Sequence, residues 1–216
     1  MKFISYRLAL QVVVLTIAFS AESEAEDPDK SAIPKQELQA KIQFCKTCHG
    51  LNGQGFRGSS PMPRLAGQIP QYIENQLQAF ADRGRENKFM YGVSHTLTPA
   101  MRAALAKYFS ELNPKPLDTG ISRLAADGKN IYEKGVPDAN VPPCTTCHGP
   151  TAKGNGEFPR LAGQLHDYTF NKLVNWSKER GLNPAAPDAS AIMAPIAHSL
   201  AKPQVEAVAA YLGGLE

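Results

Sequence analysis

The chain has 216 residues, a formal net charge of +3 at neutral pH and 43% hydrophobic residues, which suits one large or two small folded domains. So mild a charge, with no basic stripe interleaved with aromatic residues, argues against a nucleic-acid-binding protein. Because the chain has only four cysteines, their arrangement is informative.

The first 25 residues have the pattern of a secretory signal peptide. Lys2 and Arg7 precede an apolar run over residues 8–19, and small residues suited to cleavage follow it. The run is shorter than the ~20 residues of a membrane-spanning helix, although an uncleaved anchor is the alternative. We therefore expect an exported protein that resides in the periplasm after cleavage of the signal peptide.

Two parts of the chain repeat the same landmarks in the same order. Cys45–Gly50 matches Cys144–Gly149, and Pro63–Gln68 matches Pro159–Gln164. The chain is therefore a tandem duplication. Further aligned pairs are Tyr72 and Tyr168, Phe80 and Trp176, Met90 and Met193, His95 and His198, and Tyr108 and Tyr211. We expect a signal peptide over residues 1–25, a first domain over 26–112, an exposed linker over 113–120 and a second domain over 121–216.

Both domains are predicted to be all-α. Apolar residues recur at helical spacing over 36–44 and 71–82, and no stretch alternates like a strand. Thr98 followed by Pro99 predicts the start of the last helix of the first domain, and the copy of that helix is expected near Pro203. These helices are short and their apolar faces thin, so a large apolar cofactor is expected inside each domain.

Each copy contains Cys-x-x-Cys-His, the attachment signal for c-type haem. Two cysteines three positions apart lie on nearly the same side of a helical turn, so each sulfur can bond one vinyl group, and the histidine supplies the proximal nitrogen to iron. Zinc or disulfides are the alternatives, but neither requires a histidine after the second cysteine in both copies. We expect two covalently bound haem c groups, at Cys45, Cys48 and His49 and at Cys144, Cys147 and His148.

The repeat also distinguishes candidate ligand methionines from the others. Met90 and Met193 align with each other, whereas Met62 and Met101 align with other residue types. We therefore expect Met90 and Met193 to be distal sulfur ligands in the loop before each last helix. Met62 and Met101 are expected to pack in the interior.

Histidine offers an alternative distal ligand. His95 and His198 are also aligned, and a second histidine on the iron would lower its reduction potential. We favour a hydrogen-bonded role for both residues, near the start of the last helices. His166 has no counterpart in the first copy and is expected at the surface.

The segments Pro63–Leu65 and Pro159–Leu161 are expected to lie beside the haem groups. A proline carbonyl can accept the N–H on the far side of the ligating histidine and so fix its ring. The arginine that follows could pair with a haem propionate, and the leucine could pack on the ring.

These motifs resemble the two-haem class I cytochromes c, and most specifically the cytochrome c4 family, over nearly the whole mature chain. Cys45–Gly55, Cys144–Gln164 and the late methionine of each copy carry the resemblance. An insert over residues 135–142 departs from the symmetry and leaves the local loop path open. The resemblance implies one iron bound by His49 and Met90 and the other by His148 and Met193.

Axial histidine and methionine would leave no position on iron for a substrate, so the resemblance implies an electron carrier and not an enzyme. Its donors would be a quinol-oxidising cytochrome bc complex or a dehydrogenase, and its acceptor a haem–copper oxidase or another protein, with loose membrane association through these partners. The alternatives are the cytochrome subunit of a sulfide-oxidising flavoprotein, or a peroxidase or thiosulfate-oxidising haem enzyme. Residues 26–118 carry twelve basic and nine acidic side chains, so an acidic partner is expected to prefer the first half.

Overall fold

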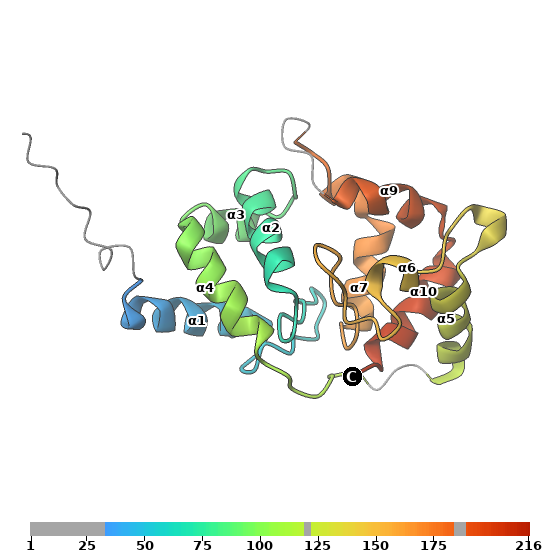
Figure 1. Ribbon diagram of the computed structural model, residues 1–216, viewed down its shortest axis with the longest axis horizontal. Coiled ribbons are helices and arrows are strands. Elements are labelled where there is room, and N and C mark those ends of the chain that lie inside the picture. The colour runs from blue at the N-terminus through green and yellow to red at the C-terminus, as the bar shows by residue number, and fades with distance from the viewer. Residues whose placement is uncertain (1–32, 119–121, 184–188) are drawn as a thin grey trace, which may run out of the picture. The chain divides into compact units, whose positions relative to one another are not determined.

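The computed structural model describes residues 33–118, 122–183 and 189–216, so the predicted signal peptide lies outside the described residues (Figure 1). In these residues β-structure is limited to isolated bridges, such as that between Phe56 and Met62, which confirms the all-α prediction. Within the same ranges, no helix is both long and apolar enough to cross a bilayer. The elements are α1 (Lys35–His49), α2 (Pro70–Ala81), α3 (Lys88–Ser94), α4 (Pro99–Ser110), α5 (Ser122–Lys134), η2 (Pro137–Ala139), α6 (Thr145–His148), α7 (His166–Val174), α8 (Trp176–Glu179), α9 (Ser190–Ser199) and α10 (Lys202–Gly213).

The first half packs α1, α2 and α3 with α4 around one apolar core (Figure 1). α2 begins at Pro70, where the missing N–H of proline costs no helical hydrogen bond. α4 begins after Thr98, whose hydroxyl accepts a hydrogen bond from the Met101 N–H at 3.2 Å, as the sequence predicts. The buried core residues are Ile42, Ile73, Leu97, Met101, Leu105, Ala106 and Phe109.

The second half packs α5 and α7 against the last helix, α10 (Figure 1). α5 approaches α10 closely at Gly128, where a Cβ atom would lie 2.0 Å from the carbonyl oxygen of Ala207. The core of this half is small, which agrees with the expected need for a cofactor. Its buried members are Tyr132, Ala152, Ala162, Val208 and Leu212.

The haem motif lies at the end of a helix in the first half and at the start of a helix in the second half. In the first half, the helix predicted over 36–44 continues through the motif to His49. In the second half, α5 ends at Lys134 and the insert over 135–142 turns back through η2. The motif of the second half therefore starts a separate short helix, α6.

The linker predicted to be exposed is held against both halves. Pro114 accepts a hydrogen bond on its carbonyl oxygen from Arg64 Nη2 at 2.8 Å. Asp118 accepts one on Oδ2 from the backbone N–H of His166 at 2.6 Å. Asn113 and Lys115 are exposed as predicted, whereas Pro114 and residues 116–118 are half-buried.

Candidate haem sites

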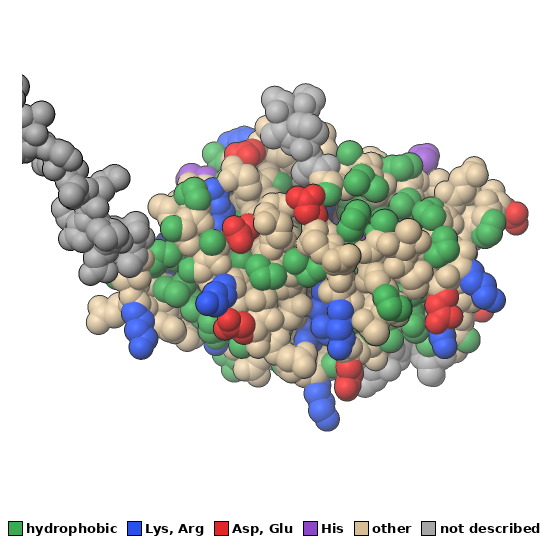
Figure 2. Space-filling model, viewed as in Figure 1, with side chains coloured by type: hydrophobic (Ala, Val, Ile, Leu, Met, Phe, Trp, Pro, Cys, Tyr) green, Lys and Arg blue, Asp and Glu red, His purple; other side chains and the backbone are tan. Residues whose placement is uncertain are grey.

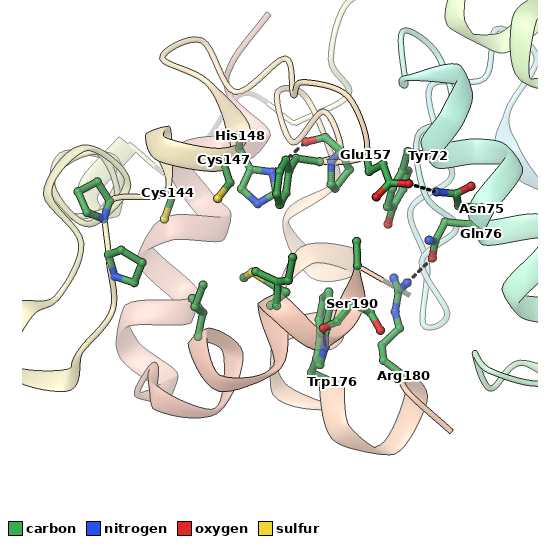
Figure 3. A pocket seen from close by; sticks show the side chains of 18 residues that line it. Tyr72, Asn75, Gln76, Cys144, Cys147, His148, Glu157, Trp176, Arg180 and Ser190 are labelled. Atoms are coloured by element: carbon green, nitrogen blue, oxygen red, sulfur yellow. Dashed lines mark hydrogen bonds between the residues drawn. The ribbon is translucent and has the colours of Figure 1, made fainter. Parts of the chain in front are cut away.

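A largely apolar cavity lies beside the haem motif of the second half (Figure 3). Its second-half walls include Cys144, Cys147, His148, Phe158, Trp176 and Met193. Tyr72, Asn75 and Gln76 on α2 complete the lining, so the first half contributes to this site.

Both motif histidines are buried and oriented by backbone carbonyl groups. His49 is 7% exposed and its Nδ1 lies 2.9 Å from the Pro63 oxygen, while His148 is 8% exposed and its Nδ1 lies 3.0 Å from the Pro159 oxygen. Because a carbonyl oxygen only accepts, Nδ1 donates the proton, and Nε2 keeps its lone pair for iron. Burial also lowers the pKa of both rings, which favours the neutral form. The predicted histidine–proline hydrogen bond is present in both halves.

The four motif cysteines are free, half-buried thiols. Cys45 and Cys48 lie one turn apart near the end of α1, and both are half-buried. Burial raises the pKa of Cys45 and that of Cys144 to about 11, so both are protonated at neutral pH. Among the described residues, no three His, Cys, Asp or Glu side chains gather as a metal site would require. The zinc alternative therefore gains no support.

The candidate distal methionines lie on short helices and not in loops as predicted. Met193 on α9 is half-buried and lines the same cavity as His148. Met90 on α3 is also half-buried, and its N–H donates to Asn87 Oδ1 at 2.9 Å, which caps that helix. Met101 is 4% exposed within the first core, which confirms its predicted packing role.

The other histidines do not line the described cavity. His95 is exposed, and its Nδ1 lies 2.8 Å from the carbonyl oxygen of Tyr91, whose ring it stacks on. His198 is exposed on α9. The surface prediction for His166 is wrong: its side chain is only 14% exposed, because its Nε2 lies 3.3 Å from the carboxylate of Glu206 on α10.

Two buried arginines offer donors at the positions predicted for haem propionates. Arg64 is 3% exposed and Arg160 is 7% exposed, and burial lowers the pKa of both guanidinium groups. Each Nε donates to a backbone carbonyl two residues further on, Ala66 at 2.9 Å and Ala162 at 3.0 Å. Arg64 Nη1 and Arg160 Nη2 are buried and have no hydrogen-bond partner in the described part of the chain. A cofactor carboxylate would satisfy such donors.

A second pair of buried arginines was not predicted. Arg85 and Arg180 are each 7% exposed, and both donate to the side-chain oxygen of Gln76 (Figure 3 shows the bond from Arg180). Arg85 also donates to the Tyr168 hydroxyl oxygen at 2.7 Å. Arg180 Nε is buried without a partner among the described residues, and Arg180 lines the cavity. The two arginines do not align in the repeat, so internal comparison could not find them.

Gln68 and Gln164 are the other functional residues that sequence reasoning missed. Each side-chain amide hydrogen-bonds the backbone of the opposite half: Gln68 binds Arg160, and Gln164 binds Arg64. A signal for them was present, because both occupy the last position of the repeated segment Pro-Arg-Leu-Ala-Gly-Gln.

The residues at both motifs therefore fit a covalently bound porphyrin. They supply paired thiols, a neutral imidazole with a free Nε2, and buried guanidinium donors for carboxylates; in the second half the thiols, the imidazole and Arg180 line one apolar cavity. When bound, the haem supplies the one-electron chemistry of iron. The fold and these sites define the class of protein as a c-type cytochrome.

Known proteins agree with this geometry. The family model described as cytochrome c matches residues 36–113 and again 125–216. Cytochrome c4 of Thiocapsa roseopersicina is 36% identical, covering 88% of this chain and 98% of its own. The thiosulfate dehydrogenase electron acceptor of Thiomonas intermedia is 34% identical, covering 98% and 92% respectively. The crystal structure of reduced recombinant cytochrome c4 from Pseudomonas stutzeri matches with a TM-score of 0.72 and 30% identity, over 86% of this chain and 100% of that one.

The chain thus belongs to the cytochrome c family, as a two-haem member of the cytochrome c4 type. It binds two haem c groups covalently through its two Cys-x-x-Cys-His motifs and acts as an electron carrier. The predicted fold class, two tandem cytochrome c domains, and the predicted cofactors are confirmed.

Proposed function

We propose that this protein is an exported carrier that takes single electrons from a respiratory donor and passes them to a haem–copper oxidase or another acceptor. His49 and Met90 bind one iron, and His148 and Met193 bind the other. The observation that carries this assignment is the second-half cavity, where His148 and Met193 reach one space from different elements. An iron with both axial positions filled changes charge without offering a substrate site.

A dehydrogenase of sulfur compounds is the favoured donor over a cytochrome bc complex. The support is the likeness over nearly the whole chain to the Thiomonas intermedia protein, named for accepting electrons from thiosulfate dehydrogenase. Stopped-flow mixing of the oxidised protein with each reduced donor tests the preference. We expect faster second-order reduction by thiosulfate dehydrogenase, and equal or slower reduction than by the bc complex would contradict it.

Exposed apolar side chains beside the second-half cavity support a docking role. Ile192 on α9 lines the cavity and is also 54% exposed. Figure 2 shows hydrophobic side chains gathered over the α9 region of the surface. A haem edge near this rim would exchange electrons across a small, short-lived interface.

An acidic partner is expected to dock on the first half. Residues 26–118 carry twelve basic and nine acidic side chains, whereas residues 119–216 carry nine of each. Salt screens attraction between exposed charges beyond about 8 Å at physiological ionic strength. The electron-transfer rate with an acidic partner should therefore fall as salt is added. A rate that does not depend on ionic strength would contradict this docking mode.

Two alternative functions make different predictions. A fixed cytochrome subunit of a sulfide-oxidising flavoprotein would co-purify with that flavoprotein in a stable complex. A haem peroxidase or thiosulfate-oxidising enzyme would leave one iron without its methionine, so one haem would lack the sulfur-to-iron charge-transfer band. The proposed carrier is isolated alone and shows the band for both haem groups.

The proposed location is the periplasm, with a mature chain that begins near residue 26. The first domain then covers residues 26–112 and the second covers 121–216. Amino-terminal sequencing of the haem-loaded protein from a periplasmic extract tests the cleavage. An intact Met1 on the membrane-bound protein would favour the uncleaved anchor instead.

A further inference from the structure

Gln68 and Gln164 exchange hydrogen bonds between the two halves in a reciprocal way. Gln68 Oε1 accepts from the Arg160 backbone N–H at 2.8 Å, and its Nε2 donates to the Arg160 carbonyl oxygen at 2.9 Å. Gln164 Oε1 accepts from the Arg64 N–H at 2.8 Å, and its Nε2 donates to the Arg64 carbonyl oxygen at 3.1 Å. Both glutamines are buried, with 6% and 8% of their surface exposed.

The backbone peptide group that each glutamine binds also accepts a hydrogen bond from a motif histidine. The N–H of Arg160 and the C=O of Pro159 belong to one peptide group. The oxygen of that C=O accepts a hydrogen bond from His148 Nδ1, 3.0 Å away. A continuous chain of hydrogen bonds thus runs from Gln68, through this peptide, to His148.

The same chain exists in the opposite direction. The peptide between Pro63 and Arg64 accepts from His49 Nδ1 at 2.9 Å and donates its N–H to Gln164. Gln164 lies in the second half, whereas His49 lies in the first. Each half therefore supplies the outer end of the hydrogen-bond chain that ends on the other half's histidine.

The glutamine oxygens are held in place by their own half as well. Gln68 Oε1 also accepts the N–H of Ile69 at 2.9 Å, and Gln164 Oε1 accepts that of Leu165 at 3.1 Å. These residues directly precede α2 and α7, so the start of each helix fixes its glutamine. A buried amide held by three hydrogen bonds in this way is rigid.

We propose that Gln68 and Gln164 are positioning residues that tune the haem of the opposite half through its proximal histidine. Accepting the peptide N–H polarises the peptide, so that its carbonyl oxygen is a stronger acceptor for the histidine N–H. A stronger acceptor makes the imidazole a more electron-rich ligand and stabilises oxidised iron. This inference rests on the proposed ligation of iron by His49 and His148.

The test is a redox titration of the haem-loaded Gln68→Leu protein, followed by proton NMR. Haem methyl signals report each haem separately, and contacts with side chains of its own half assign them. At a fixed potential we expect the ratio of reduced to oxidised second-half haem to rise about two- to tenfold, with the first-half haem unchanged. Gln164→Leu should raise the same ratio for the first-half haem and leave the second-half haem unchanged.

Gln68→Glu separates this tuning from a purely structural contact. Glutamate keeps an oxygen that accepts the Arg160 N–H, so the second-half haem should not become easier to reduce. The proposal is overturned if Gln68→Leu changes the ratio of reduced to oxidised haem in neither half, or mainly in the first half. It is also overturned if Gln68→Leu and Gln68→Glu change the ratio of the second-half haem in the same direction. Should Gln68→Leu fail to assemble, Gln164→Leu and Gln68→Glu answer the same question.

The outcome also distinguishes this inference from the proposed function. If iron were not bound by methionine and histidine, the unsubstituted protein would lack the sulfur-to-iron band. If only the tuning were wrong, the band would be present for both haem groups while the substitutions left both ratios unchanged.

Discussion

At the scale of single residues, the site is built by fixing one nitrogen of each histidine. The carbonyl oxygens of Pro63 and Pro159 each accept a hydrogen bond from Nδ1 of one ring. Nε2 then remains free to bind iron. The proline could be predicted from the sequence because it recurs at a constant place in both copies.

The methionine assignment is tested by Met90→His and Met193→His. Histidine is a stronger donor to oxidised iron than a thioether, so each change should lower one reduction potential by on the order of 0.1–0.3 V, within the ~0.8 V span set by axial ligands. The other potential should stay nearly fixed. A spectroelectrochemical titration of each variant measures both.

Met62→Leu is the matched control for these substitutions. Met62 lies on a described loop beside Phe56 and has no methionine counterpart in the other half, so both potentials should remain unchanged. Unchanged potentials in Met90→His or Met193→His, or shifts of equal size in Met62→Leu, would show that the distal ligands are wrongly assigned.

At the scale of elements, the closest packing is between α5 and α10. Gly128→Ala would place a Cβ atom 2.0 Å from the Ala207 oxygen and 2.7 Å from Tyr211 Cβ, so the helices must move apart. Overpacking outweighs the better helix propensity of alanine, and we expect a loss of about 1–3 kcal/mol in the free energy of unfolding. Chemical denaturation of the haem-loaded protein measures the loss.

Gly92→Ala on α3 provides the control, because a Cβ atom there meets nothing within 4 Å. It should leave stability unchanged or raise it by up to about 1 kcal/mol. If Gly128→Ala were as well tolerated as Gly92→Ala, the close contact between α5 and α10 would be wrong.

Periodicity and capping predicted the helices better than their ends. The start of α4 after Thr98 could be predicted because its cap is local. The extension of α1 through the haem motif and the helical setting of Met90 and Met193 could not. These short segments have too few apolar positions to show a period, and packing around the cofactor site decides their conformation.

At the scale of the whole molecule, the two halves share buried charge. Arg85 comes from the first half and Arg180 from the second, and both donate to Gln76. Gln76→Ala would leave buried guanidinium donors without this acceptor, which should cost about 1–3 kcal/mol of unfolding free energy. Thermal or chemical unfolding of the haem-loaded variant checks this expectation.

Gln78→Ala is the control on the same helix. Gln78 is exposed and its side-chain amide donates to Asp82 at 2.7 Å, so its loss should change the unfolding free energy by less than about 0.5 kcal/mol. Equal effects of the two substitutions would show that Gln76 does not stabilise the arginine pair.

Contacts between the halves are what sequence reasoning could not supply. The repeat showed that Gln68 and Gln164 are equivalent, but not that each binds the other copy, because their partners are about a hundred positions away in the chain. The burial of His166 beside Glu206 likewise depends on how α7 packs against α10. A local sequence pattern does not predict such long-range contacts.

The central claim is that each half holds one haem iron between a histidine and a methionine. The most direct measurement is the intensity of the sulfur-to-iron charge-transfer band of the oxidised protein, divided by its haem content. The account predicts two haem groups per chain and a full band for each. A band accounting for one haem or none, at a content of two, would contradict it.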